Sequence, residues 1–119
     1  MTAVGRVSTV MVNCNDLDAV VPFWAAVLGV DVAERAGPYV WLGVQDGQGV
    51  AVAFQQVEDV KTARNRVHLD VAVPDLEAAR GRVEELGGHV VERRTGGTTT
   101  WYIAADPEGN EFCLYEPHP

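Results

Sequence analysis

One histidine in a strand-like segment carries the most suggestive chemistry of this sequence. His68 stands in Arg66-Val-His-Leu-Asp-Val-Ala-Val73, where apolar and other residues alternate. An imidazole there can bind a metal ion, act as a general base near neutral pH or hydrogen-bond a ligand. Strand alternation puts His68 on one face with Arg66, Asp70 and Ala72. The opposite face is apolar and is expected to lie beneath a helix.

Further reactive side chains stand near the other end of the chain. A thiolate at Cys113 with His68 as its base would be a nucleophilic pair, but nothing marks an oxyanion hole or a third orienting residue. Asp70 and Glu111 offer acid or base chemistry, although we expect a salt bridge to Arg66 or a solvated position instead. Cys14 and Cys113 lack a CxxC spacing, which favours free thiols in a reducing compartment.

Composition excludes several classes of partner. The chain has 119 residues and a formal net charge of -8, with few clustered basic residues, which argues against nucleic acid or an anionic membrane surface. No long apolar span or signal-peptide-like apolar run is seen, so we expect a cytoplasmic protein. The length and apolar content fit one domain over residues 1–119.

The elements that would position these side chains follow from periodicity and turn residues. Apolar residues at helical spacing predict two helices, at residues 17–28 and 76–86, with Asp16 as the N-cap of the first. Pro22 leaves a kink or a later start of that helix open. Short β-rich runs predict strands at residues 7–14, 31–34, 39–44, 50–56, 66–73, 89–94, 98–105 and 111–116.

The order of elements occurs twice, and the residues themselves repeat. Asp16-Leu-Asp-Ala is echoed by Asp75-Leu-Glu-Ala, and Leu28-Gly-Val-Asp-Val-Ala-Glu-Arg by Leu86-Gly-Gly-His-Val-Val-Glu-Arg. Such ordered matches at nearly constant separation predict an internal duplication. We therefore expect an α+β fold of two tandem βαβββ modules, at about residues 5–57 and 65–117. Together they would form a curved mixed sheet around a cleft, with the helices outside.

Alternation within the predicted strands selects the residues that face this cleft. The repeat aligns Thr9 with His68 and Gln55 with Cys113, so these four side chains are expected to converge on the cleft. Aromatic rings suit a flat organic ligand, although a core or dimer-interface role is equally open for Trp41 and Trp101. The parity of the strand with Trp101 and Tyr102 is ambiguous. The predicted ligand-binding set is Thr9, Met11, Tyr39, Trp41, Gln55, His68, Trp101 and Cys113.

Two glycine-containing segments are predicted as connections. Asp106-Pro-Glu-Gly109 has the composition of a turn, because proline fixes φ and glycine accepts a positive φ. Gly96-Gly-Thr-Thr-Thr100 is predicted as a polar hinge or loop over the cleft. A phosphate cradle is disfavoured there, since neither a lysine nor a helix start follows.

With two such modules and the terminal Asp106-Pro-Glu-Gly-Asn-Glu-Phe-Cys-Leu114 segment, the chain resembles the glyoxalase, bleomycin-resistance and dioxygenase superfamily, also called the vicinal oxygen chelate proteins. Lys61-Thr-Ala-Arg-Asn-Arg-Val-His-Leu-Asp70 resembles its small glyoxalase-like domains. The resemblance covers essentially the whole chain. It implies the fold and a homodimer, but not a reaction, because the superfamily uses one scaffold for several chemistries and for drug sequestration.

The resemblance also implies a metal position in some members, whose ligands come from four strands. The matching residues are Thr9, Gln55, His68 and Cys113, of which only His68 is a good ligand for a hard or borderline cation. We therefore expect no cofactor and, if a divalent metal binds at all, His68, Gln55 and Cys113 as its ligands.

The expected function is binding of a small organic molecule, aromatic or hydrophobic, in the cleft without a catalytic metal. Two alternatives stay open. One is a metal-dependent glyoxalase-like lyase or isomerase, and the other is a metal-free enzyme with His68 as its base.

Overall fold

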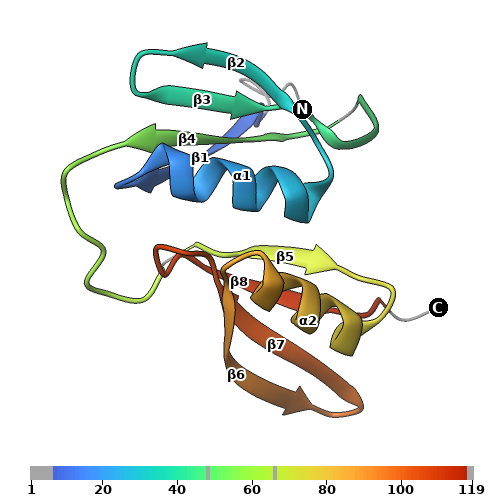
Figure 1. The fold of residues 1–119 in the computed structure, drawn as a ribbon. Coiled ribbons are helices and arrows are strands. Elements are labelled where there is room, and N and C mark those ends of the chain that lie inside the picture. The colour runs from blue at the N-terminus through green and yellow to red at the C-terminus, as the bar shows by residue number, and fades with distance from the viewer. Residues whose placement is uncertain (1–6, 48, 66, 118–119) are drawn as a thin grey trace, which may run out of the picture. The chain divides into compact units, whose positions relative to one another are not determined.

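The computed structural model describes residues 7–47, 49–65 and 67–117, and it divides into two compact units, Met1–Val60 and Lys61–Pro119. The division falls in the segment predicted to connect the two modules. We call the units module 1 and module 2 and describe each by itself. Each has the order strand, helix and three strands, so the predicted pair of βαβββ modules is confirmed (Figure 1).

Module 1 is a four-stranded mixed sheet with one helix on it (Figure 1). The strand order is β1-β4-β3-β2, with β1 parallel to β4 and the other neighbours antiparallel. A 3-10 turn, η1, covers Gln45–Gly47. The bounds are β1 Thr9–Cys14, α1 Leu17–Leu28, β2 Val32–Ala36, β3 Tyr39–Leu42 and β4 Ala51–Gln56.

Module 2 repeats this arrangement in the order β5-β8-β7-β6, with β5 parallel to β8. The duplication extends to an irregularity in the second strand: the pairing register shifts between Val32 and Glu34, and again between Val90 and Glu92. The bounds are β5 Leu69–Ala72, α2 Leu76–Glu85, β6 His89–Gly96, β7 Thr99–Ala105 and β8 Glu111–Tyr115.

The helix starts follow from side-chain caps. The Asp16 carboxylate accepts a hydrogen bond from the backbone N–H of Asp18, and the Asp75 carboxylate accepts one from Ala78. Each satisfies a donor that the first helical turn leaves free. Because Asp16 fixes the start, α1 begins at Leu17 despite Pro22.

Each module has its own core between sheet and helix. In module 1 the buried side chains of β3, Val40 and Leu42, alternate with half-buried ones, and Phe54 of β4 and Trp24 of α1 are buried as well. Phe112 and Leu114 of β8 hold the corresponding places in module 2. The core thus lies on the face of each sheet that the helix covers. We call the opposite face of the sheet the open face.

Two predicted connections differ in outcome. Asp106 to Gly109 is a turn, and the fully buried Asp106 carboxylate accepts hydrogen bonds from the backbone of Glu108 and Asn110. The expected loop at residues 96–100 is shorter than predicted: Gly97 and Thr98 form a turn, whereas Gly96, Thr99 and Thr100 lie in β6 and β7. Gly97, at φ 60°, allows the tight reversal between these strands.

The other predicted bounds agree with the structure to within a few residues, and Arg66 lies outside the described residues. β5 begins at Leu69, so His68 immediately precedes the strand in which the sequence placed it. Neither α1 nor α2 of the described chain has the length and apolar content that crossing a bilayer requires.

Candidate functional site

Five of the predicted ligand-binding residues belong to module 1, and pairing places them on its open face. Tyr39 pairs with Gln55, and Trp41 with Ala53, which also pairs with Met11. The Gln55 amide donates to the Tyr39 hydroxyl at 3.3 Å. The Tyr39 and Trp41 ring centroids are 5.7 Å apart, so these side chains form a continuous aromatic and amide surface.

The register of β1 and β4 separates two of these residues. Thr9 pairs with Ala51, whereas Gln55 pairs with Asn13, four residues farther along both strands. At about 3.3 Å per residue, this offset is roughly 13 Å. Thr9 and Gln55 therefore share a face but do not meet at one point.

Module 2 contains a pocket of about 510 Å³ on its open face. It brings together three predicted residues, His68, Trp101 and Cys113. Their convergence with the module 1 residues stays a prediction. The full lining is Arg64, Asn65, His68, Asp70, Arg94, Thr99, Trp101, Ile103, Glu111, Phe112, Cys113 and Tyr115.

The strand parity left open by the sequence is settled within β7. Trp101 pairs with Tyr115 of β8 and lines the pocket, which puts its ring on the open face. Tyr102 points to the helix side, where its hydroxyl donates to Glu77 and the guanidinium carbon of Arg80 lies 5.6 Å from its ring centroid. Tyr102 is therefore a packing residue.

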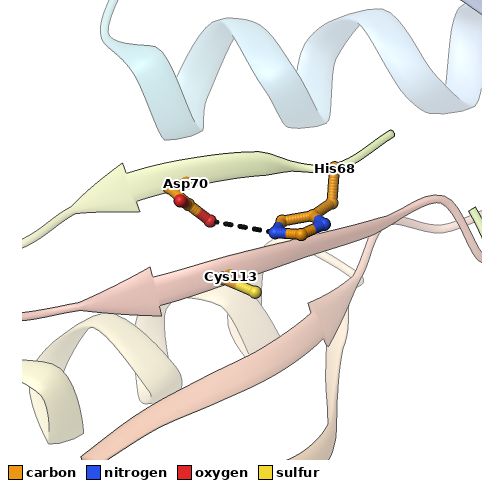
Figure 2. Close-up of side chains that lie close together, drawn as sticks. All are labelled: His68, Asp70 and Cys113. Atoms are coloured by element: carbon orange, nitrogen blue, oxygen red, sulfur yellow. Dashed lines mark ion pairs between the residues drawn. The ribbon is translucent and has the colours of Figure 1, made fainter. Parts of the chain in front are cut away.

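The chemistry of the pocket is concentrated in a cluster of three side chains, shown in Figure 2. His68 Nε2 lies 3.3 Å from Asp70 Oδ1, and one ligand atom each of His68, Asp70 and Cys113 lie within 4.8 Å of one another. Asp70 pairs directly with Cys113 across β5 and β8. Two residues apart on nearly extended backbone, His68 and Asp70 face the same way.

The Cys113 thiol is partly buried, and its pKa is raised above the ordinary value of 9.0. Burial is the main cause, because it disfavours the thiolate, and the Asp70 carboxylate adds to it by charge and by accepting a hydrogen bond. Without a bound cation the thiol is therefore protonated at neutral pH. This state makes Cys113 a poor nucleophile.

A second charged group closes one side of the pocket. Arg64 Nε lies 2.6 Å from a carboxylate oxygen of Glu111, and the Asn65 backbone N–H donates to the same carboxylate. The hydrogen bond from Arg64 is the main reason why the pKa of Glu111 lies below its ordinary value. Arg64 is thus a partner of Glu111, and His68 is one of Asp70, whereas the expected salt bridge to Arg66 lies outside the described residues.

Several residues of the pocket were not predicted from sequence. Asp70 was assigned to an ion pair or the solvated rim, although its position two residues after His68 was a signal for a shared ligand site. Arg64 precedes β5 in an irregular segment, where no periodicity indicates direction. Arg94 lines the pocket beside its pairing partner Trp101, and the periodicity of the sequence does not give this register.

The donor set decides which metal fits. Imidazole, carboxylate and thiol groups together suit a borderline or soft ion such as zinc, whereas magnesium, calcium and manganese favour all-oxygen sites. The expected ligand Gln55 belongs to the other module, whereas Asp70 lies directly beside Cys113. The residues of module 2 thus fit a zinc-type ion better than a hard one.

Comparisons with known proteins identify the fold and the family. The glyoxalase-like domain model matches residues 9–115, whereas no curated protein matches the chain. Similar solved structures include a glyoxalase-related enzyme from Fulvimarina pelagi, with 17% identity, a TM-score of 0.73 and coverage of 94% of this chain and 88% of that one. Another is a glyoxalase/bleomycin resistance protein/dioxygenase from Nocardioides, with 15% identity, a TM-score of 0.71 and coverage of 100% and 89%.

A third similar structure holds a metal ion. It is an E126Q mutant of the fosfomycin resistance protein FosX from Listeria monocytogenes in complex with Mn(II) and 1S,2S-dihydroxypropylphosphonic acid. It has 13% identity, a TM-score of 0.77 and coverage of 98% of this chain and 93% of that one. At such identities the structures establish the fold alone. Because the family model spans nearly all of both modules, the chain belongs to the glyoxalase-like domain family, and its fold is that of the glyoxalase, bleomycin-resistance and dioxygenase superfamily.

Proposed function

We propose that this protein binds a small organic molecule with a flat aromatic or hydrophobic part on the open face of module 2. The observation that carries the proposal is a row of side chains across three paired strands. Tyr115, Trp101 and Arg94 are successive pairing partners, and all three line the pocket. Such a row offers two ring surfaces and a cation beside them.

Polar groups next to this row supply orientation. Arg94 contacts Glu92 at 3.2 Å, and both side chains are about half exposed, so the guanidinium keeps donors for an oxygen of the ligand. His68 stands in the same pocket and can donate or accept a hydrogen bond. We propose that the open face of module 1, with Thr9, Met11, Tyr39, Trp41 and Gln55, is a further aromatic and polar surface for ligands of this kind.

The test is a binding assay with a panel of planar aromatic carboxylic acids and phenols. Ligand-detected NMR and calorimetry measure the binding. Trp101→Ala should abolish saturable binding of any compound that the native protein takes up. Tyr102→Phe is the matched control, because Tyr102 neighbours Trp101 but points to the helix side. Saturable binding that survives Trp101→Ala, or no binding across the panel, would sink the proposal.

A second candidate function is metal-free proton transfer with His68 as the general base. The observation that favours it is the Asp70 carboxylate 3.3 Å from His68 Nε2, because a neighbouring carboxylate orients an imidazole. Turnover of an α-hydroxy ketone that survives chelators and disappears in His68→Gln would support this candidate. The metal-dependent lyase or isomerase that relies on Gln55 stays a prediction, and its turnover would stop with chelators.

We also propose a cytoplasmic homodimer. Support for a reducing compartment comes from the small number of cysteines and from the lack of a CxxC spacing between Cys14 and Cys113. The homodimer rests on the family resemblance. Sedimentation of the purified chain tests it, and a monomer at micromolar concentration would contradict it.

A further inference from the structure

We propose that His68, Asp70 and Cys113 form a three-ligand site for one zinc-type divalent ion within module 2. The proposal goes beyond the binding of an organic molecule, which requires no ion. Among the described residues, these three were found as a group whose ligand atoms all lie within 4.8 Å of one another (Figure 2).

The backbone itself brings the three side chains together. The pairing of β5 with β8 puts Asp70 directly beside Cys113, and the extended backbone turns His68 to the same face. Bonds of about 2.0–2.3 Å to zinc give tetrahedral edges of roughly 3.3–3.8 Å between ligand atoms. The distance of 3.3 Å between His68 Nε2 and Asp70 Oδ1 already equals one such edge. Rotations of the side chains are enough to shorten the other distances between ligand atoms.

The charges of the three ligands also match a divalent ion. A neutral imidazole, a carboxylate and a thiolate sum to two negative charges, so a dication gives a neutral site. A thiolate selects zinc, cobalt or cadmium over magnesium and calcium. Three protein ligands leave the fourth tetrahedral position free, as in catalytic rather than structural zinc sites. Because all three residues line the pocket, that position is accessible to a water or a ligand.

This site differs from the one that the family resemblance implies. That site draws its ligands from four strands and would include Gln55 of module 1. The present one uses two adjacent strands of module 2 and gives Asp70 a role that the resemblance does not. Two variants therefore separate the two sites. Asp70→Asn removes a ligand from the site proposed here, whereas Gln55→Ala removes one only from the site that the resemblance implies.

Cobalt(II) is the probe, because cobalt–thiolate bonds absorb in the near ultraviolet and tetrahedral cobalt absorbs strongly in the visible. The full chain is reduced, freed of metal with a chelator and titrated with cobalt(II), and zinc affinity is then measured by competition. The variants are His68→Gln, Asp70→Asn, Cys113→Ser and Gln55→Ala. Matched controls are His89→Gln, which changes an exposed histidine of β6, and Cys14→Ala, which removes the other thiol. Circular dichroism checks that each variant folds.

The expected result is one cobalt per chain with thiolate absorption that Cys113→Ser abolishes and Cys14→Ala preserves. His68→Gln and Asp70→Asn should each weaken zinc binding by at least about tenfold, since even residues that only support ligands have effects of this size. His89→Gln and Gln55→Ala should leave the affinity within about twofold. Three outcomes would overturn the proposal: no stoichiometric binding, binding without thiolate absorption, or an Asp70→Asn affinity equal to that of the native chain.

Discussion

Asp70 lies directly opposite Cys113 in the parallel pairing of β5 with β8, so a carboxylate stands beside a partly buried thiol. This relationship has two opposite consequences. In the metal-free protein the carboxylate helps to keep the thiol protonated, whereas with a bound cation both groups become ligands. The Asp70 carboxylate therefore makes the Cys113 thiol less reactive in the metal-free protein, and it is a second ligand beside Cys113 when a metal ion binds.

Cys113 in the metal-free protein should react faster with iodoacetamide when Asp70 is changed to Asn. Asp70 raises the pKa of the thiol, so its neutralisation lowers that pKa and increases the thiolate fraction at pH 8. Burial, the larger cause, is unchanged, so the increase is limited. Mass spectrometry of the Cys113 peptide, with chelator present, measures the rate. Asp59→Asn, an exposed carboxylate in the connecting segment, is the control, and an unchanged or slower rate in Asp70→Asn would contradict the assignment.

Glu111 should make stability depend on pH in the acid range. Its pKa is lowered from the ordinary 4.5, chiefly by the hydrogen bond from Arg64, so the folded state binds fewer protons than the unfolded state. The stabilisation is present above pH 4.5 and is lost as the pH falls through the lower folded pKa. Urea unfolding should therefore show Glu111→Gln destabilised at pH 7, with a difference that shrinks below pH 4.5.

The control for Glu111 is Glu34→Gln, which changes an exposed carboxylate on β2. Its effect on unfolding should be small at every pH. A Glu111→Gln difference that is constant between pH 7 and pH 3, or that grows in acid, would show that the Arg64 contact does not act through the charge of Glu111.

Local sequence signals were sufficient for the fold. Asp16, as an N-cap, predicted the start of α1, and the echo of Leu28-Gly in Leu86-Gly marked the repeat that gives two βαβββ modules. Strand parity in β3 and β8 followed from alternation, since every second residue is buried. Errors arose where a turn is tighter than its composition suggests, as at Gly96, because two glycines also permit a hairpin.

The site was only partly predictable, because its contacts depend on register. Alternation gives the face of Cys113, but only the pairing of β5 with β8 shows that its neighbour is Asp70. The same information separates Thr9 from Gln55, which alternation alone places on one face without giving the distance between them. Contacts from irregular segments, such as that of Arg64 with Glu111, leave no periodic signal in the sequence.

The two modules should lose similar stability when one fully buried phenylalanine of each core is truncated. These residues are Phe54 of β4 and Phe112 of β8. Each change to alanine removes a large ring from a packed core, which costs about 3–5 kcal/mol of unfolding free energy. Urea denaturation measures this loss, with Phe→Leu variants for the case that the alanine variants do not fold. Val91→Ala at an exposed site of β6 should change stability by less than about 1 kcal/mol. If truncation of either phenylalanine lowered the free energy of unfolding by less than about 1 kcal/mol, the assigned cores would be contradicted.

Gly96 should control the position of the Trp101 ring. A Cβ atom at Gly96 would lie 3.3 Å from two ring carbons of Trp101, so Gly96→Ala must displace the ring by a few tenths of an ångström. We expect a shifted indole N–H resonance of Trp101 and weaker binding of any aromatic ligand in the pocket. Gly81→Ala is the matched control, because a Cβ there meets nothing within 4 Å. It should stabilise α2 by about 0.5–1 kcal/mol and leave the Trp101 resonance in place. An unshifted Trp101 resonance in Gly96→Ala would mean that the ring does not lie against β6. The assignment of this ring to the pocket wall beside Gly96 would then be wrong.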